Sequence, residues 1–264
     1  MASVGDIQAK IEKLQRAEEE VRRLQDELID DAQASRGAAI EALREAVLEG
    51  LGHGEGPEAA AALVPLAEVL GELEGAETAD LLIDLLGSDE PEVRFTAGRA
   101  LQDLAFDRFK EVAEATERAA KRLKADNQAL RELPYVVAEV GEPGVPKILR
   151  GYLAHGDAEV VAAAIEALAA LGDHAAIVEL KRLVRDPRTV QLDEEEADAQ
   201  ASIGTLAEEA IAMIMEGAGM GAPSPHQHAP QGAPKGGPPP RTGQGGPRTP
   251  PRNPRAPEGG GRRR

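Results

Sequence analysis

The feature that most constrains the fold is an internal repeat of apolar residues. A shift of 67 residues superimposes one set of Leu, Val and Ala positions on a second set with the same spacing. The first set is Leu82, Leu86, Val93, Ala97, Ala100, Leu101 and Leu104; the second is Leu149, Leu153, Val160, Ala164, Ala167, Leu168 and Leu171. Within each set the residues recur every three or four positions, which describes one face of an α-helix. The shift is two periods of about 33 residues, a length typical of solenoids built from helix pairs.

A middle unit fits between these two. At a shift of 31, three of its apolar residues, Leu130, Val137 and Val140, fall on Val161, Leu168 and Leu171 of the later unit. Segments containing Gly, Asp or Pro separate the periodic stretches, as expected for turns between helices. No segment alternates between apolar and polar residues at period two, so we expect no strands. The sequence therefore predicts an all-α fold.

Residues 78–105 carry motifs that resemble a HEAT repeat. The motifs are Leu-Leu-x-x-Leu-Leu, then Ser-Asp-Glu-Pro-Glu-Val-Arg, then Ala-x-x-Ala-Leu-x-x-Leu. Residues 145–172 are similar, although Val161 stands where the Arg would be. The resemblance extends over residues 36–216, with two units close to the pattern and three that match it only loosely. It implies an α-α superhelix, a HEAT-like solenoid of about five helix pairs.

The HEAT resemblance also implies roles for two polar residues. Asp89 in the turn and Arg94 after the Val correspond to a polar ladder between repeats. Because Val161 replaces the Arg in the later unit, we expect the ladder to be interrupted there. Pro91 is expected in the first turn of a helix, where the missing N–H costs nothing, with Ser88 or Asp89 available as the N-cap.

Charge and composition divide the chain into three parts. Residues 218–264 contain eight basic residues, one acid and 12 of the 19 prolines, for a net charge of +7. The 22 basic and 46 acidic residues before them give −24, within a total of −17. A Pro- and Gly-rich segment with few apolar side chains cannot offset its ordering entropy. We predict an N-terminal amphipathic helix over 1–34, HEAT-like repeats over 35–217 and a disordered basic tail over 218–264.

The N-terminal segment is expected to form one long charged helix. Its main apolar residues recur every seven positions: Ile7, Leu14, Val21 and Leu28. A heptad repeat of this kind is compatible with a coiled-coil homodimer. Glu18 and Gln25 occupy the second seam position, however. Because a terminal repeat needs a cap, packing on the first repeat is our preferred prediction, and the homodimer is the alternative.

The sequence offers no constellation for chemistry. The chain has no Cys, which excludes disulfides, thiolate nucleophiles and Cys-based zinc sites. Motifs for a serine-hydrolase elbow, a phosphate-binding loop or a His-Glu-x-x-His zinc site are absent. The acidic run 193–196 lies at a predicted helix start, where the helix dipole favours acids. We predict no catalytic, cofactor or metal site, and no enzyme.

The location of the protein follows from similar exclusions. Charges interrupt every apolar stretch, so no membrane insertion is expected. Residues 1–10 contain no apolar run of the kind found in secretory signals. We expect a cytoplasmic protein, and its richness in Ala, Arg, Gly and Pro suggests a GC-rich bacterial genome.

The remaining clue to function is the set of side chains that the helices are expected to expose on their surface. The HEAT resemblance implies that the second helix of each pair lines the concave face and carries the recognition residues. All five aromatics lie in the central stretch; of these, Phe106, Phe109 and Tyr152 are expected to fill gaps between repeats. Aromatic and Arg side chains are typical of binding hot spots. The predicted partner-binding residues are Phe95, Arg99, Gln102, Asp103, Arg131, Tyr135, Glu139 and Glu166.

Three functions are compatible with this pattern. The preferred one is a non-catalytic scaffold or regulatory adaptor that binds a protein partner through its concave face, with the basic tail modulating the contact. The alternative is a nucleic-acid-associated protein whose tail binds an anionic partner, since the acidic body repels phosphate backbones. A distant alternative is a HEAT-like lyase. DNA glycosylases of the alkylpurine type, which resemble HEAT proteins, imply a basic groove with Trp, and this chain has no Trp.

Overall fold

The structure, a computed structural model, describes residues 3–191 and 200–217. By its contacts the chain divides into two units, Met1–Pro225 and His226–Arg264, and all the described residues belong to the first. The tail predicted over 218–264 and the acidic run 193–196 lie outside the described residues. The division of the chain at 34 and 217 therefore stays a prediction.

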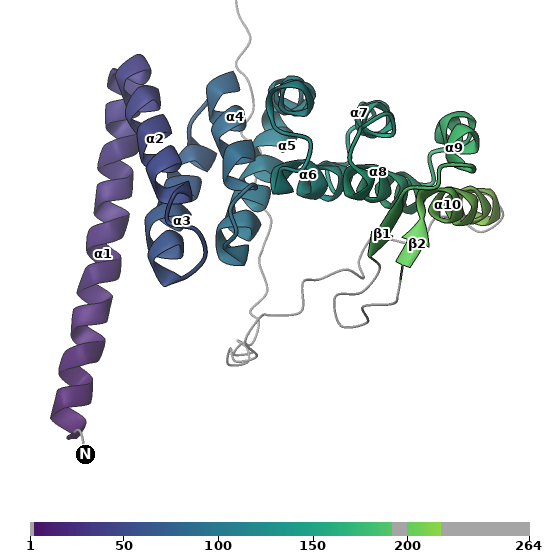
Figure 1. The fold of residues 1–264 in the computed structure, drawn as a ribbon. Helices are drawn as coiled ribbons and strands as arrows, with labels where there is room; N and C mark the ends of the chain where they lie inside the picture. Colours follow the sequence, from purple (N-terminus) through teal and green to yellow (C-terminus); the bar gives the residue numbers. More distant parts are fainter. Residues whose placement is uncertain (1–2, 192–199, 218–264) are drawn as a thin grey trace, which may run out of the picture. The chain divides into compact units, whose positions relative to one another are not determined.

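The described part of the chain is almost entirely helical, and Figure 1 shows its elements in order. The helices are α1 (Val4–Ala34), α2 (Arg36–Leu51), α3 (Pro57–Glu72), α4 (Ala76–Leu85), α5 (Pro91–Arg122), α6 (Gln128–Ala138), α7 (Val145–Tyr152), α8 (Ala158–Leu171), α9 (Ile177–Leu183) and α10 (Ile203–Gly217). A short 3-10 helix (His174–Ala176) precedes α9, and two strands, β1 (Thr189–Gln191) and β2 (Gln200–Ser202), pair antiparallel.

Neighbouring helices pack in pairs, and the pairs stack into a solenoid, so the predicted all-α solenoid fold is confirmed. The backbone of α5 leaves helical geometry at Arg108 (φ −135°, ψ 45°), which divides it into residues 91–107 and 109–122. The pairs are α2 with α3, α4 with the first half of α5, the second half of α5 with α6, α7 with α8, and α9 with α10. We call the first member of each pair a first helix and the second member a second helix.

Each layer packs mainly Leu and Ala side chains between neighbouring helices. Leu82, Leu101, Leu130 and Leu168 are fully buried, one each in α4, α5, α6 and α8. Small residues bring helices close together, since a Cβ at Gly71 would lie 3.1 Å from the Cβ of Ala100 in α5. Thin layers of this kind need few large aromatic residues, which explains the low aromatic content.

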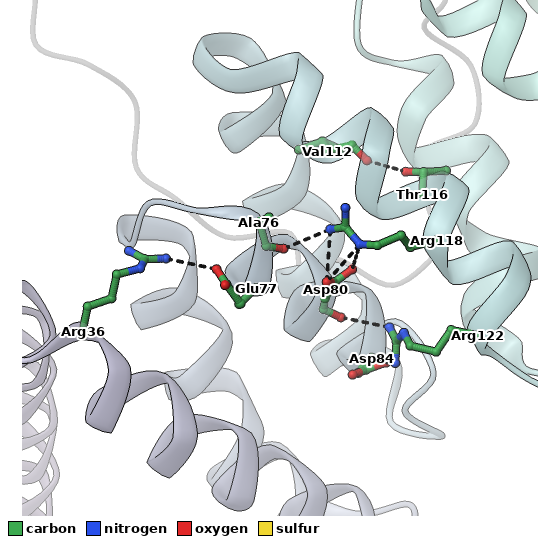
Figure 2. Close-up of polar contacts among 9 residues, drawn as sticks. All are labelled: Arg36, Ala76, Glu77, Asp80, Asp84, Val112, Thr116, Arg118 and Arg122. Carbon is green, nitrogen blue, oxygen red and sulfur yellow. Dashed lines mark hydrogen bonds and ion pairs between the residues drawn. The ribbon is translucent and has the colours of Figure 1, made fainter.

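Polar contacts tie the first helices to one another (Figure 2). Arg118 of α5 donates to both carboxylate oxygens of Asp80 in α4, at 3.1–3.3 Å. One turn later, Arg122 donates to Oδ1 of Asp84 at 2.7 Å. Arg36 of α2 forms a longer ion pair with Glu77 of α4, at 3.7 Å. These contacts fix the register of α4 between its two neighbours.

The expectation of no strands is wrong. β1 and β2 pair through Thr189 with Ser202 and Gln191 with Gln200, and only Val190 is buried in either strand. Three-residue strands are too short to show a period-two pattern, so the sequence carried no signal for them. The helix predicted from residue 193 begins instead at Ile203.

Helix α1, which precedes the pairs, contacts the repeats only through its C-terminal end. Ala32 is buried, and Leu28 and Ile29 pack against the core. The Gln25 side chain donates to the Pro65 carbonyl of α3 at 3.3 Å and to Glu68 at 2.7 Å. The preceding residues of α1 keep their apolar side chains exposed.

Candidate partner-binding surface

The first half of α5 presents a stripe of exposed side chains along one face. Phe95, Arg99, Asp103 and Phe106 follow one another at intervals of three or four residues, which places them on the same side of a helix. Phe95 is 56% exposed and Phe106 is 84% exposed. Between them, Arg99 and Asp103 lie 3.9 Å apart as an exposed ion pair. Two aromatic side chains therefore flank a pair of opposite charges.

Hydrogen bonds connect this stripe to the next two second helices. Gln102 Nε2 donates at 2.9 Å to Oε2 of Glu139, the C-cap residue of α6. One turn before Glu139, the Tyr135 hydroxyl donates to Glu166 Oε2 of α8 at 2.7 Å. The two bonds place side chains of α5, α6 and α8 in one continuous row. We call this row the second-helix surface, and its members are Phe95, Arg99, Gln102, Asp103, Phe106, Tyr135, Glu139 and Glu166.

Tyr135 is a neutral side chain that lies among the carboxylates of this surface. Desolvation, then the hydrogen bond to Glu166, then the carboxylates of Glu166, Glu132 and Glu159 raise the pKa of its hydroxyl above the ordinary value. The hydroxyl thus stays protonated and remains a donor at neutral pH. The ring itself is 45% exposed, so an aromatic face is available among carboxylates. Such a site favours apolar and cationic side chains.

Arg131, also predicted to bind a partner, forms an ion pair within the fold. Its Nη2 lies 3.3 Å from Oδ2 of Asp157. The other oxygen of Asp157 caps α8 by accepting from the amides of Glu159 and Val160. Arg131 therefore joins α6 to the N-terminus of α8, and a partner contact by this partly exposed side chain stays a prediction.

The polar ladder differs from the one that the resemblance implied. Arg94 donates to the backbone carbonyls of Ser88 and Asp89, both at 2.9 Å, and its Nε lies 3.4 Å from Glu132 of α6. Asp89 contributes its carbonyl, while its exposed side chain caps nothing. The N-cap of α5 is Glu90, and Pro91 is at the first helical position as predicted.

The interruption at Val161 is bridged from the next unit. Val161 is buried in the core, as its apolar side chain requires. The turn carbonyls that correspond to Ser88 and Asp89 belong to His155 and Gly156, and both accept from Arg188 Nη1, at 3.0 and 2.9 Å. The same pair of carbonyls is thus satisfied by an Arg within the unit in one case and by an Arg of the following unit in the other.

Of the other three aromatic residues, all predicted to fill gaps between repeats, two pack against the core and one is exposed. Tyr152 is buried and its hydroxyl donates to the Thr116 carbonyl at 3.1 Å, so it fills a gap between repeats. Phe109 packs against the core near Gly144. Phe106 does not, because it precedes the break at Arg108 and continues the exposed stripe of α5. The expectation that Phe106 fills a gap is therefore wrong, and its distance of eleven residues from Phe95, about three helical turns, is the signal that could have placed it on the exposed stripe.

No other kind of site is found in the described residues. Within residues 3–191 and 200–217, no group of three or more His, Asp or Glu is arranged to hold a metal. Among the helices of these same segments, none combines the length and apolar character needed to cross a bilayer.

No protein-family model matches the sequence, and no curated protein matches it. Two solved structures are similar to the chain. One is an engineered protein with 20% identity, covering 73% of this chain and 97% of its own, with a TM-score of 0.29. The other is a designed armadillo repeat protein with 20% identity, covering 73% of this chain and 94% of its own, with a TM-score of 0.27. At these TM-scores the likeness establishes neither a family nor a function.

Proposed function

We propose that the protein is a non-catalytic, HEAT-like scaffold or adaptor that binds a protein partner through the second-helix surface. The observation that carries this proposal is the exposure of Phe95, Phe106 and Tyr135 in one row on neighbouring helices. Aromatic residues exposed together cost solvation free energy, and they are the side chains that dominate binding energy in interfaces. Packing in the hydrophobic core does not explain these aromatic residues, because Leu and Ala side chains already fill the core.

The charges of the surface support a partner that presents basic and apolar side chains. Glu132, Glu159 and Glu166 surround Tyr135, and Arg99 is the principal cation of the α5 stripe. Opposite charges on a partner would be steered toward such a surface, more strongly at low salt. The partner contact is therefore expected to weaken as ionic strength rises.

The basic tail belongs to the same proposal as a second, separate contact. Its net charge of +7 favours an anionic partner, either an acidic protein or a nucleic acid. Removal of residues 218–264 distinguishes the two functions of the chain. Loss of nucleic-acid retention by the truncated protein would favour a nucleic-acid role, and unchanged protein binding would favour the scaffold.

The surface itself is tested by substitution. Phe95→Ala with Tyr135→Ala removes two partly exposed rings outside the core, so the helical content is expected to stay unchanged, while loss of the Tyr135–Glu166 hydrogen bond should lower the unfolding midpoint only slightly. Binding of a captured protein partner is expected to weaken at least about tenfold. An unchanged affinity in a folded double variant would show that partners bind elsewhere.

We also propose that the chain self-associates through α1, which is the homodimer given as the alternative for the N-terminal helix. The long apolar stripe that α1 leaves uncovered supports it.

A further inference from the structure

The exposed part of α1 is amphipathic in a way that its own repeats do not use. Four large apolar side chains of its first three turns are at least 49% exposed, with Leu14 at 61%. They lie at alternating spacings of three and four residues, as in the seam of a coiled coil. These residues are Val4, Ile7, Ile11 and Leu14. Val21 extends the seam after an interruption at Glu18.

The start of this segment is well defined although it packs against nothing else in the described residues. Ser3 and Asp6 form a reciprocal capping box, in which the Ser3 hydroxyl accepts from the Asp6 amide and the Asp6 carboxylate accepts from the Ser3 amide. The helix is therefore stabilised from its first turn. A stable helix with an exposed seam is ready to pair with another helix of the same kind.

We propose that α1 pairs with α1 of a second copy of this chain in the antiparallel direction, with residue i of one helix opposite residue 25−i of the other. This inference rests on the self-association proposed above and adds the direction and register. In this register Val4 packs against Val21 of the other copy, and Ile11 packs against Leu14. Every layer over residues 4–21 then contains at least one apolar side chain, because Glu18 of each helix lies opposite Ile7 of the other.

Glu18 selects the direction. In a parallel pair in register, Glu18 of both helices would share one seam layer, and two like carboxylates in an apolar seam repel each other. In the antiparallel pair each Glu18 faces Ile7 instead, and Lys10 of the other helix lies in adjacent layers. The two Glu18 carboxylates thus lie in two separate layers, each opposite an apolar side chain, in place of one layer in which they would face each other.

The charge at the far end of the seam fits the same direction. A groove where α1 meets α3 is bordered by Glu18, Val21 and Glu68. The antiparallel register brings the N-terminal turn of the other α1 beside this groove. The partial positive charge of that N-terminus attracts these two carboxylates, while the Asp6 carboxylate that already caps it opposes them.

Leu14→Glu in the full-length protein tests the seam. We expect the wild-type chain to have twice the mass of a single chain in sedimentation or light scattering over a concentration series. The substitution is expected to weaken self-association at least about tenfold, because it removes two buried Leu side chains per dimer. Ala9→Glu, on the opposite, exposed face of α1, is the matched control and should leave the dimer intact.

Disulfide cross-linking tests the direction, because the chain has no native cysteine. An equal mixture of the Val4→Cys and Val21→Cys proteins should form a mixed dimer on mild oxidation, while Val4→Cys alone should stay uncross-linked. A cross-link of Val4→Cys with itself would overturn the antiparallel direction but leave self-association in place. A wild-type chain that stays monomeric throughout the concentration series would overturn both, as would a dimer that Leu14→Glu leaves unaffected.

Discussion

Replacement of Arg122 by Met tests the polar contact that joins α5 to α4 at its most buried point. The Asp84 carboxylate is 13% exposed, whereas the Arg122 side chain that pairs with it at 2.7 Å is 41% exposed. A charge-assisted hydrogen bond contributes about 1.5–3 kcal/mol, and solvent around the partly exposed Arg122 reduces that value. We therefore expect Arg122→Met to destabilise the protein by about 1–2 kcal/mol, and Met preserves most of the apolar stem.

The pH dependence of this loss separates the charge from the packing. Burial raises the pKa of Asp84 above its ordinary 3.8, and the hydrogen bond and charge of Arg122 oppose that rise. Removal of Arg122 moves the pKa higher still, while Arg44 and Asp80 keep their opposing influences. Because the unpaired carboxylate is costly only when ionised, the difference between wild type and variant should be full at neutral pH. It should shrink as the pH falls through the pKa of Asp84 in the variant.

Thermal unfolding of both proteins at a series of pH values from 7 to about 4 measures this difference. At neutral pH the midpoint should fall by about 2–8 °C. Lys110→Met is the control, because the Lys110–Glu114 pair is exposed and its loss should cost under about 0.5 kcal/mol. A difference that stays constant with pH would refute the electrostatic explanation and assign the effect to the Arg122 stem.

Two further substitutions test the last helix pair. Arg188→Ala should lower the unfolding midpoint by an amount equivalent to about 1–2 kcal/mol, because two turn carbonyls lose their donor. The control is Arg185→Ala, at an exposed position, which should have little effect. Equal effects of the two substitutions would contradict the bridging role of Arg188. Gly204→Ala should destabilise by about 2 kcal/mol or more, since the new Cβ would lie 2.5 Å from the Val184 carbonyl oxygen. Gly151→Ala meets nothing within 4 Å and should instead stabilise α7 slightly, as denaturation of the three proteins would show.

The parts of the fold that follow from periodic apolar residues could be predicted from the sequence. Leu82, Leu101 and Leu168 are buried where the helical pattern placed them. The break at Arg108 could not be predicted, because no Gly or Pro marks it and the contact of Arg108 with the Leu73 carbonyl is distant in sequence. Phe106 precedes the break and follows the regular spacing of the α5 stripe, so its exposure could have been predicted from its distance to Phe95.

The candidate surface was predictable in part for a similar reason. Helical spacing identified Phe95 and Tyr135 as lying outside the core. Spacing alone does not reveal tertiary partners, so the pairing of Arg131 with Asp157 and the bridge from Arg188 to the preceding turn needed the structure. Side chains at the ends of helices are the least predictable, because turn geometry decides what they reach.

The central claim is that Phe95 and Tyr135 belong to a protein-binding surface. Its most direct test is quantitative capture from cell lysate with wild type, with Phe95→Ala/Tyr135→Ala, and with a control that removes two equally exposed apolar residues of the first helices, Leu48→Ala/Val178→Ala. We predict that proteins captured by wild type and by the control are depleted about tenfold or more with the aromatic variant. Equal recovery with all three folded baits, or a loss confined to the control, would contradict the account.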